Sequence, residues 1–418
     1  MKNLFTILTL SLSVSLFLSC GNGDSPIEER KDLVQEVKVL NTETRKITID
    51  NDAHFVSIEF IEGTDISNVE IQIKLVEGVS MVTPESSTAA FDFSHGTQSF
   101  TVKKGNTEIT YQFKIKFVFD PTSKGWQITN TWGALPEYLS VYKYTNKINN
   151  KNVKAYIAVT DMNNTTARFS VLGEAKYIDV WSMPTPTQFY TTFSNPKALM
   201  NGGYFGGSSS IGLIVREGQL INPQQITISR TYEDRTIKYY PTWGAFGLNS
   251  DGTFSAHWCY TPDGKTIYCY EKPVDETGKT PQSLPSASYP TKATIWKPKE
   301  AIGAGPVLIK GGEYKNTWEA EMFDDKSGVG PNNNNPRSAI GSTPNKHLIF
   351  FVCEGRNTAE SIPGLTLHEV TNLLLEIGCS EAINLDGGGS SCMLINGKET
   401  IKPSDGNQRR ITSAVAVY

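Results

Sequence analysis

An apolar strand that ends in an acid and three consecutive glycines constrains the fold of this chain more than any other feature. Residues 382–385 are followed by Asp386, Gly387-Gly388-Gly389, Ser390 and Ser391. Successive glycines lose much conformational entropy on folding, so a protein keeps them where the backbone takes a positive φ or another group approaches closely. Consecutive N–H groups in such a loop can bind an anion. The loop predicts a cradle for phosphate or an oxyanion beside a carboxylate; a wide turn that serves only packing is the alternative.

A short amphipathic helix precedes this strand. Thr366 and Glu369 have the spacing of a capping box, in which both side chains accept hydrogen bonds from backbone N–H groups at the start of a helix. The apolar positions on one face of that helix are Leu367, Val370, Leu374 and Ile377. Gly378 supplies a stop. Because an apolar run at 348–353 comes earlier, the predicted local order is strand, helix, strand.

Charged side chains that suit a phosphate site also occur near the ends of other predicted strands. The run at 348–353 ends in Glu354-Gly355-Arg356, and Arg337 lies upstream in Asn335-Pro336-Arg337. Loops at strand ends present functional side chains on a rigid frame, and a guanidinium matches phosphate in two-point contact. Taken alone, either arginine more often forms a surface ion pair. The glycine-rich segment 201–207 has the composition of a sugar-facing loop, although in isolation a turn with core aromatics explains it better.

The N-terminal residues predict export. Lys2 precedes fifteen mostly apolar residues, Leu4–Leu18, which are too few to span a bilayer. A charged start, a short apolar core and a small-residue exit are typical of a secretory signal. Around Cys20 the sequence resembles the lipobox of bacterial lipoproteins, which implies acylation of Cys20 and a membrane anchor. We therefore expect a signal peptide at 1–20 and an exported, lipid-anchored protein, periplasmic or on the cell surface.

Two domains are expected after this leader and a linker at 21–36. Residues 37–120 show short alternating or β-branched runs separated by turns, which is typical of a β-sandwich. The runs that predict strands are 37–40, 45–49, 55–61, 69–75, 98–102 and 107–119. The region resembles the immunoglobulin-like modules at the front of Bacteroides-type surface lipoproteins. After a second linker at 121–130, residues 131–418 are enough for one large core. The predicted fold class is α+β, with an immunoglobulin-like sandwich followed by a larger mixed α/β catalytic domain.

The charge and cysteine content of the chain limit which partners and cofactors we expect. The chain has 39 Lys+Arg against 43 Asp+Glu, so it lacks the basic surface that nucleic-acid binding requires. The sequence contains no CxxC motif or His–Cys cluster with zinc spacing, and we expect neither a metal nor another cofactor. Cys259 and Cys269 flank a hairpin turn signal, which allows a cross-strand disulfide, although the spacing alone does not establish its geometry. Cys353, Cys379 and Cys392 lie in apolar runs, where buried thiols are expected.

Taken in order, these segments resemble the phosphodiester glycosidase family. The segments that carry the resemblance are Asn201–Phe205, Gly305–Gly311, Pro336–Gly341, Glu354–Arg356, Gly364–Leu367 with Glu369, and Asn384–Ser391. The similarity covers roughly residues 154–418. The chain departs from the family pattern at Glu354, where Asp is usual, and at Ser338, where Thr is frequent. Both changes keep the chemical type but alter the reach of the side chain.

The resemblance implies hydrolysis of the sugar C1–O–phosphate bond in a sugar-1-phosphate diester, with an N-acetylglucosamine-like sugar. Because negative charge grows on the departing phosphate, charge stabilisation matters more than a strong general acid. The expected catalytic residues are Asp386 and Glu354, as nucleophile or base and as acid in an unassigned order, with Arg337 and Arg356 stabilising the phosphate. The expected substrate-binding residues are Asn201, Gly202, Thr366, Asn384, Gly387, Gly388, Gly389, Ser390 and Ser391.

The expected partners are a glycan or glycolipid that carries such a diester, and a membrane through Cys20. The alternative is a non-catalytic surface lipoprotein that binds a glycan or sugar phosphate, which the front sandwich and Glu354 suggest. A structural lipoprotein without a ligand would leave the triple glycine and the two arginines without purpose. His368, on the capped helix, fits a structural role as well as a catalytic one. The sequence does not decide the sugar or the anomeric outcome.

Overall fold

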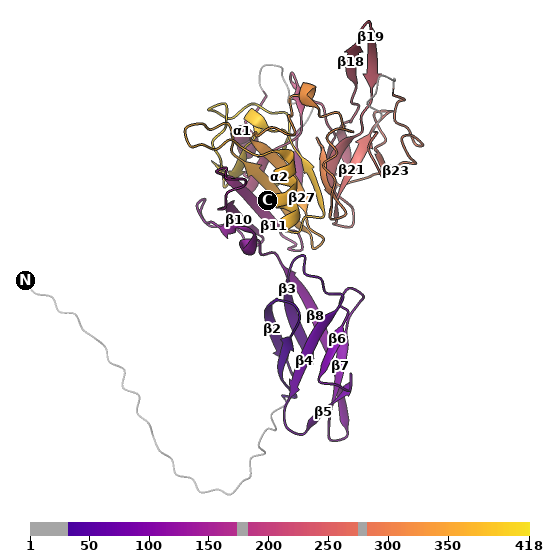
Figure 1. Cartoon of the computed structure of the whole chain (residues 1–418), viewed down its shortest axis with the longest axis vertical. Coiled ribbons are helices and arrows are strands. Elements are labelled where there is room, and N and C mark those ends of the chain that lie inside the picture. The colour runs from indigo at the N-terminus through magenta and orange to yellow at the C-terminus, as the bar shows by residue number, and fades with distance from the viewer. Residues whose placement is uncertain (1–31, 174–182, 275–281) are drawn as a thin grey trace, which may run out of the picture. The chain divides into compact units, whose positions relative to one another are not determined.

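The computed structural model describes residues 32–173, 183–274 and 282–418. Two compact units make up the chain (Figure 1): one extends to Thr42 and includes Ile47–Ile58 and Ile66–Lys114, and the other consists mainly of Ile115–Tyr418. The predicted linker at 121–130 lies a few residues beyond this division. The predicted signal peptide and the Cys20 anchor lie outside the described residues. No helix in the described ranges is long and apolar enough to cross a membrane.

The first part of the chain forms a three-stranded sheet in the order β1-β4-β6 and a five-stranded sheet in the order β2-β3-β8-β7-β5. The strands are β1 Val34–Val39, β2 Thr44–Asp50, β3 Phe55–Ile61, β4 Val69–Leu75, β5 Val79–Thr83, β6 Thr88–Phe91, β7 Ser99–Lys104 and β8 Thr107–Val118. Strand β4 alternates buried and exposed positions, as a strand with one buried face should. The sequence runs predicted six of these strands but not β5 and β6, whose small and polar residues give little alternation.

Three antiparallel sheets build the second unit. An eight-stranded sheet has the order β26-β25-β29-β27-β28-β11-β10-β9, a seven-stranded sheet the order β17-β16-β24-β20-β21-β22-β23, and a five-stranded sheet the order β12-β32-β13-β30-β31. The first sheet contains β9 Trp126–Ile128, β10 Leu139–Tyr144, β11 Ala155–Asp161, β25 Val307–Lys310, β26 Glu313–Tyr314, β27 Arg337–Ser342, β28 His347–Cys353 and β29 Glu381–Asn384. The second contains β16 Ile214–Arg216, β17 Gln219–Asn222, β20 Trp243–Leu248, β21 Phe254–Tyr260, β22 Tyr268–Tyr270, β23 Thr294–Ile295 and β24 Glu300–Gly303. The third contains β12 Phe169–Leu172, β13 Ala198–Asn201, β30 Met393–Ile395, β31 Lys398–Glu399 and β32 Ala414–Val417.

Helices are few in this unit. The described residues contain two α-helices, α1 Pro186–Thr192 and α2 Leu367–Glu376. Two hairpins, β14 Phe205–Gly206 with β15 Ser209–Ser210 and β18 Ile228–Tyr232 with β19 Arg235–Tyr239, stand apart from the three sheets. Neighbouring strands in those sheets run antiparallel and need no crossover helices. The β-rich character is thus confirmed, whereas the mixed α/β and immunoglobulin-like assignments are not.

Helix α2 is the element that the sequence predicted most fully. Thr366 caps it, and Thr366 and Glu369 form the capping box in both directions. Gly378, with φ of 87°, follows its C-terminus in the left-handed region. The helix connects β28 to β29, which flank β27, so the predicted order of strand, helix and strand is confirmed.

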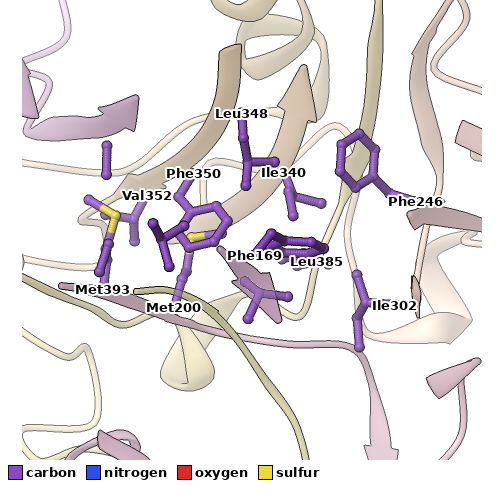
Figure 2. Close-up of a cluster of buried hydrophobic side chains, with 14 of the residues drawn as sticks. Phe169, Met200, Phe246, Ile302, Ile340, Leu348, Phe350, Val352, Leu385 and Met393 are labelled. Atoms are coloured by element: carbon purple, nitrogen blue, oxygen red, sulfur yellow. The ribbon is translucent and has the colours of Figure 1, made fainter. Parts of the chain in front are cut away.

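Strand β28 is buried on both faces and organises the core. Leu348, Phe350 and Val352 belong to a cluster with residues of the other two sheets (Figure 2). The alternate residues, Ile349 and Phe351, pack in a second cluster with the apolar face of α2. The first cluster includes Leu385, fully buried directly before Asp386, and Met200, directly before Asn201. The close packing of this cluster therefore fixes the two chain segments that carry the predicted site.

Candidate active site

A cavity of about 860 Å³ lies at the end of β29. Its size is in the range of roughly 300–1,000 Å³ that is usual for small-molecule sites. The charged side chains that line it are Arg230, Arg337, Arg356, Arg409 and Asp386, and the aromatic ones are Tyr204, Phe205, Trp243 and Phe323. Among the described lining residues, Asp386 is the only carboxylate. The cavity thus combines a single acid with an excess of guanidinium groups and an apolar wall.

The backbone of Asp386 is held from both sides. Its N–H donates to Gly202 O at 3.1 Å, and its carbonyl oxygen accepts from Asn201 Nδ2 at 2.7 Å. Asn201 Oδ1 in turn accepts from Ser338 Oγ at 2.7 Å and from the Cys392 N–H at 3.1 Å. Asn201 and Gly202 are fully buried and do not line the cavity. Asn201 and Gly202, which the sequence predicted to bind substrate, therefore lie behind Asp386 and position its backbone.

The carboxyl group of Asp386 titrates in an environment that disfavours its charge. Burial raises its pKa to about 6, against smaller opposing effects of the Ser390 hydroxyl, the Arg409 charge and the Gly387 N–H. Removing a carboxylate from water disfavours its ionised form. A group with this pKa is ionised at neutral pH yet basic enough to accept a proton, which suits a general base or a nucleophile.

Arg337 begins β27 and is 2% exposed. Its guanidinium donates four hydrogen bonds to backbone carbonyls, and its burial lowers its pKa. The acceptors are Leu365 O at 3.0 Å, Val329 O at 2.9 Å, Gly330 O at 2.7 Å and Asn333 O at 2.8 Å. These bonds satisfy most of the N–H groups but leave the charge without a counter-ion. Arg337 thus holds the cavity wall together and adds positive potential to it.

Arg356 lies on the exposed side of the cavity with φ of 56°. Its Nε and Nη2 atoms donate to Asn335 Oδ1 at 3.1 and 2.9 Å. Within the described chain, neither Arg356 nor Arg337 forms an ion pair with a carboxylate. Arg409 and Arg230 do, with Asp405 at 2.7 Å and Asp324 at 3.0 Å. The uncompensated positive charge of the cavity is therefore that of Arg337 and Arg356.

The glycine loop does not present the row of free amides that its sequence suggested. Residues Gly388–Ser390 form a 3₁₀ turn, and the N–H of Gly388 donates to Pro336 O at 2.9 Å. The N–H groups of Ser390 and Ser391 donate to Gly387 O at 3.1 Å and Gly388 O at 3.2 Å. A methyl group at Gly388 would lie 3.3 Å from the Arg356 guanidinium, and one at Gly389 would overlap the side chains of Asp405 and Arg409. The glycines thus admit charged side chains to the cavity rim.

Besides Asn201 and Gly202, three predicted substrate-binding residues, Thr366, Ser390 and Ser391, lie outside the cavity lining. Thr366 caps α2, and its hydroxyl accepts from the Glu369 N–H at 3.2 Å. Ser390 and Ser391 are buried within the loop, each 1% exposed, and the Ser390 hydroxyl hydrogen-bonds to the Asp386 carboxyl. His368 is also remote, since it is exposed on α2 and contacts the Tyr314 hydroxyl at 2.9 Å and Asn372 Nδ2 at 3.1 Å. The contacts of Thr366 and His368 stabilise α2.

Glu354 also lies outside the lining and is 1% exposed. Its carboxylate accepts from Lys154 Nζ at 2.8 Å, Asn357 Nδ2 at 2.6 Å and the Lys402 N–H at 2.9 Å. Burial alone would raise its pKa, but these three partners together hold the pKa below its ordinary value. A carboxylate that stays ionised and saturated with donors has no proton to give. The geometry therefore gives no support to Glu354 as a general acid.

The aromatic wall of the cavity had almost no signal in the sequence. Tyr204, Trp243 and Phe323 form an aromatic cluster with ring centroids 5.7, 5.4 and 4.7 Å apart. Behind it the fully buried Glu321 accepts from the Gly244 N–H at 2.6 Å, while its carbonyl oxygen accepts from Trp243 Nε1 at 2.8 Å. Burial raises the pKa of Glu321 to about 7. These residues come from distant segments without a shared motif, so only Tyr204, in the glycine-rich segment, carried a signal.

The sequence profile of phosphodiester glycosidases matches residues 194–418, which is more than half of the chain. The chain belongs to the phosphodiester glycosidase family. The matched region contains Asp386, both uncompensated arginines and the aromatic wall. Among the described residues, no group of three or more His, Cys, Asp or Glu side chains is placed to hold a metal ion.

Individual relatives match shorter segments. Human N-acetylglucosamine-1-phosphodiester alpha-N-acetylglucosaminidase is 32% identical over 124 residues, which are 27% of this chain and 24% of the human protein. The prophage-derived protein YomE of Bacillus subtilis is 35% identical over 82 residues, 20% of this chain and 12% of its own length. The chain thus spans a quarter or less of these relatives. The catalytic domain of the zebrafish phosphodiester glucosaminidase, auto-inhibited by its pro-peptide, aligns with a TM-score of 0.49 and 19% identity over 70% of this chain and 87% of that one.

Proposed function

We propose that this phosphodiester glycosidase hydrolyses the C1–O bond of a sugar-1-phosphate diester and releases a free sugar and a phosphomonoester. The observation that carries the proposal is the pairing, in one cavity, of the single carboxylate among the described lining residues, whose pKa is raised, with two guanidinium groups that have no carboxylate partner in the described chain. The carboxylate suits the anomeric carbon and the guanidiniums suit the phosphate. The human relative is named as an N-acetylglucosamine-1-phosphodiester alpha-N-acetylglucosaminidase, so we propose a sugar of that kind.

The arginines stabilise the leaving group. As the C1–O bond breaks, the bond electrons move to the phosphate, and the diester monoanion becomes a monoester with a second negative charge. Arg337 is already fixed by four hydrogen bonds, so it need not reorganise as this charge develops. Arg356 retains N–H groups beyond the two that bond to Asn335. Two preorganised charges lower the need for protonation of the leaving oxygen, consistent with the absence of a second carboxylate among the described lining residues.

Asp386 supplies the carboxylate chemistry at C1. As a base it would take a proton from the attacking water, and the sugar would appear with inverted configuration. As a nucleophile it would form a glycosyl ester that water then cleaves, and the configuration would be retained. Nuclear magnetic resonance of the anomer that forms first distinguishes the two roles. We assign Glu354 to the support of this region, where it binds Lys154 and the Lys402 amide.

The aromatic wall provides the sugar site. Tyr204, Trp243 and Phe323 present apolar surface to the cavity, against which the C–H face of a pyranose can pack. The cavity thus offers apolar surface for the sugar and guanidinium groups for its phosphate. The same arrangement would serve a binding protein that has lost catalysis, so product formation decides between the two functions.

The direct test uses the methyl phosphodiester of N-acetyl-α-glucosamine 1-phosphate. The wild-type protein should release N-acetylglucosamine and methyl phosphate, and the Asp386→Asn variant should release them at least about a hundredfold more slowly. Asp263→Asn is a matched control, because Asp263 is an exposed turn residue that does not line the cavity. Binding of the diester without product in the wild type would reject the hydrolase proposal, and equal rates for wild type and Asp386→Asn would reject the role of Asp386.

We also propose that the protein is exported and anchored through an acylated Cys20, on the basis of its N-terminal sequence. Expression of the full chain in a bacterium with radiolabelled palmitate tests this. Wild type should carry the label and sediment with membranes, whereas Cys20→Ala should lose both properties. Unlabelled wild-type protein would reject the anchor.

A further inference from the structure

Asn384 is the last residue of β29 and lines the cavity, although the residue is only 1% exposed. Its Nδ2 atom donates to Leu385 O at 2.7 Å, Gly305 O at 3.1 Å and the Tyr204 hydroxyl at 2.8 Å. Its Oδ1 atom is buried and has no hydrogen-bond partner in the described chain. The wall of the cavity therefore contains an amide whose donor side is crowded and whose acceptor side is empty.

The orientation of this amide is fixed by chemistry. Backbone carbonyl oxygens only accept hydrogen bonds, so the two carbonyls of Leu385 and Gly305 require the nitrogen, not the oxygen, on their side. The Tyr204 hydroxyl already donates its one proton to Gly305 O at 2.7 Å, so it accepts from Asn384. Burial raises the pKa of Tyr204, which keeps that proton in place. A rotation of the amide by 180° would break all three bonds.

The vacant acceptor needs a donor that none of the described residues provides. A buried polar atom without a partner is costly and rare in native proteins. Neither a phosphodiester nor a phosphomonoester dianion has a proton to donate, so phosphate oxygens cannot satisfy Asn384 Oδ1. The hydroxyl groups and the acetamido N–H of an amino sugar can.

We propose that Asn384 Oδ1 accepts a hydrogen bond from a hydroxyl or amide N–H of the sugar and is a specificity-determining residue. The inference rests on the proposed function and deepens it. Asn384 and Asp386 both line the cavity, while Leu385 between them is buried in the core. The sugar thus lies between the acceptor of Asn384 and the carboxylate of Asp386, with its phosphate directed toward Arg337 and Arg356.

The consequence is selectivity against sugars that lack the donor. A cavity built to accept a hydrogen bond rejects an analogue without it strongly, because the buried acceptor is then left unpaired. A fluorine atom in place of a hydroxyl keeps the size but removes the proton, and an ester oxygen in place of the amide N–H does the same for the acetamido group. One of these analogues should bind far more weakly than the others.

Calorimetric binding of N-acetyl-α-glucosamine 1-phosphate and its analogues tests the proposal. The analogues carry fluorine at position 3, 4 or 6, or a 2-O-acetyl group. For the wild type we expect one analogue to bind about ten- to a hundredfold more weakly than the parent. In Asn384→Ala this difference should disappear. In Tyr204→Phe it should persist, because the carbonyls of Gly305 and Leu385 still orient the amide.

Three results would overturn the proposal: equal binding of every analogue to the wild type, a difference that survives in Asn384→Ala, or no binding of the parent. If Asn384→Ala does not fold, a crystal structure of the wild type with the parent ligand decides. A sugar oxygen or nitrogen within about 3.2 Å of Asn384 Oδ1 supports the proposal, and any other arrangement contradicts it. Because these readouts measure binding, they stay distinct from failure to hydrolyse the diester, which would reject only the proposed function.

Discussion

Replacing Asp386 with Asn should abolish activity and stabilise the protein at neutral pH. Burial raises the pKa of Asp386 from 3.8 to about 6. Because the folded state binds this proton more tightly than the unfolded state, the contribution of Asp386 to stability is fully present below pH 3.8 and lost as the pH rises through 6. Asparagine does not titrate and avoids this loss. The ionised carboxylate therefore destabilises the folded protein at neutral pH, and the active site keeps it for its chemistry.

The magnitude follows from the same pKa. A rise from 3.8 to about 6 corresponds to about 3 kcal/mol at pH 7.5, at about 1.4 kcal/mol for each pH unit. Solvent in the cavity screens Asp386, so this is an upper limit. We expect Asp386→Asn to raise the free energy of unfolding by about 1–3 kcal/mol at pH 7.5 and to leave it nearly unchanged at pH 4.

Urea unfolding followed by tryptophan fluorescence at the two pH values measures the difference. Asp263→Asn is the control of opposite sign, because hydrogen bonds from the Thr266 N–H and hydroxyl and the Lys265 N–H lower the pKa of Asp263 to about 2. Its loss should weaken the protein at pH 7.5. A variant Asp386→Asn that is less stable than the wild type at pH 7.5, or a difference that does not change with pH, would refute the reasoning.

Three further predictions follow from the contacts described above. Activity, as kcat/KM, should fall with decreasing pH through about 6, where Asp386 becomes protonated; an acidic limb near pH 4 would contradict its assignment. Glu354→Gln should lower the free energy of unfolding by about 1–3 kcal/mol, because Lys154 and the Lys402 amide lose a charged acceptor. The same variant should change kcat less than about tenfold in the folded protein, and a hundredfold loss of kcat would show that Glu354 is catalytic after all. Cys259 and Cys269 are buried and oppose each other on β21 and β22 with sulfur atoms 2.9 Å apart, so refolding of the denatured protein in glutathione disulfide should link the pair, and mass spectrometry should find the linked peptides; two freely alkylated thiols after that refolding would contradict this.

Local order was accessible from the sequence, whereas the sheet arrangement was not. The capping box and apolar spacing sufficed for α2, and the apolar run sufficed for β28. The sheets depend on pairings between distant segments: Ala198 pairs with Val417, and Ala155 pairs with Cys353. Propensity and periodicity describe neighbours in sequence, so they do not specify which strands meet. The mixed α/β assignment of the second unit is therefore not confirmed, since its described residues form antiparallel sheets with two short helices.

The candidate site was likewise predictable from the sequence only where its residues lie in a local pattern. Asp386, Arg337 and Arg356 carried a local signal, and the structure brings all three to one cavity. Glu354 carried the same signal, because it lies in the same strand-end segment as Arg356. Only Arg356, whose φ is 56°, lines the cavity, and Glu354 does not. Arg409, on a polar C-terminal segment, had no pattern to distinguish it from its neighbour Arg410. The distinction between a lining residue and a supporting one depends on side-chain direction, which composition and spacing do not encode.

The most direct test of the central claim is hydrolysis of the methyl phosphodiester of N-acetyl-α-glucosamine 1-phosphate in water enriched in oxygen-18. Phosphorus nuclear magnetic resonance detects the label in the product, because oxygen-18 shifts the phosphorus signal. Cleavage of the C1–O bond at Asp386 predicts methyl phosphate without the label. Methyl phosphate that carries oxygen-18 would mean attack at phosphorus and would contradict the account.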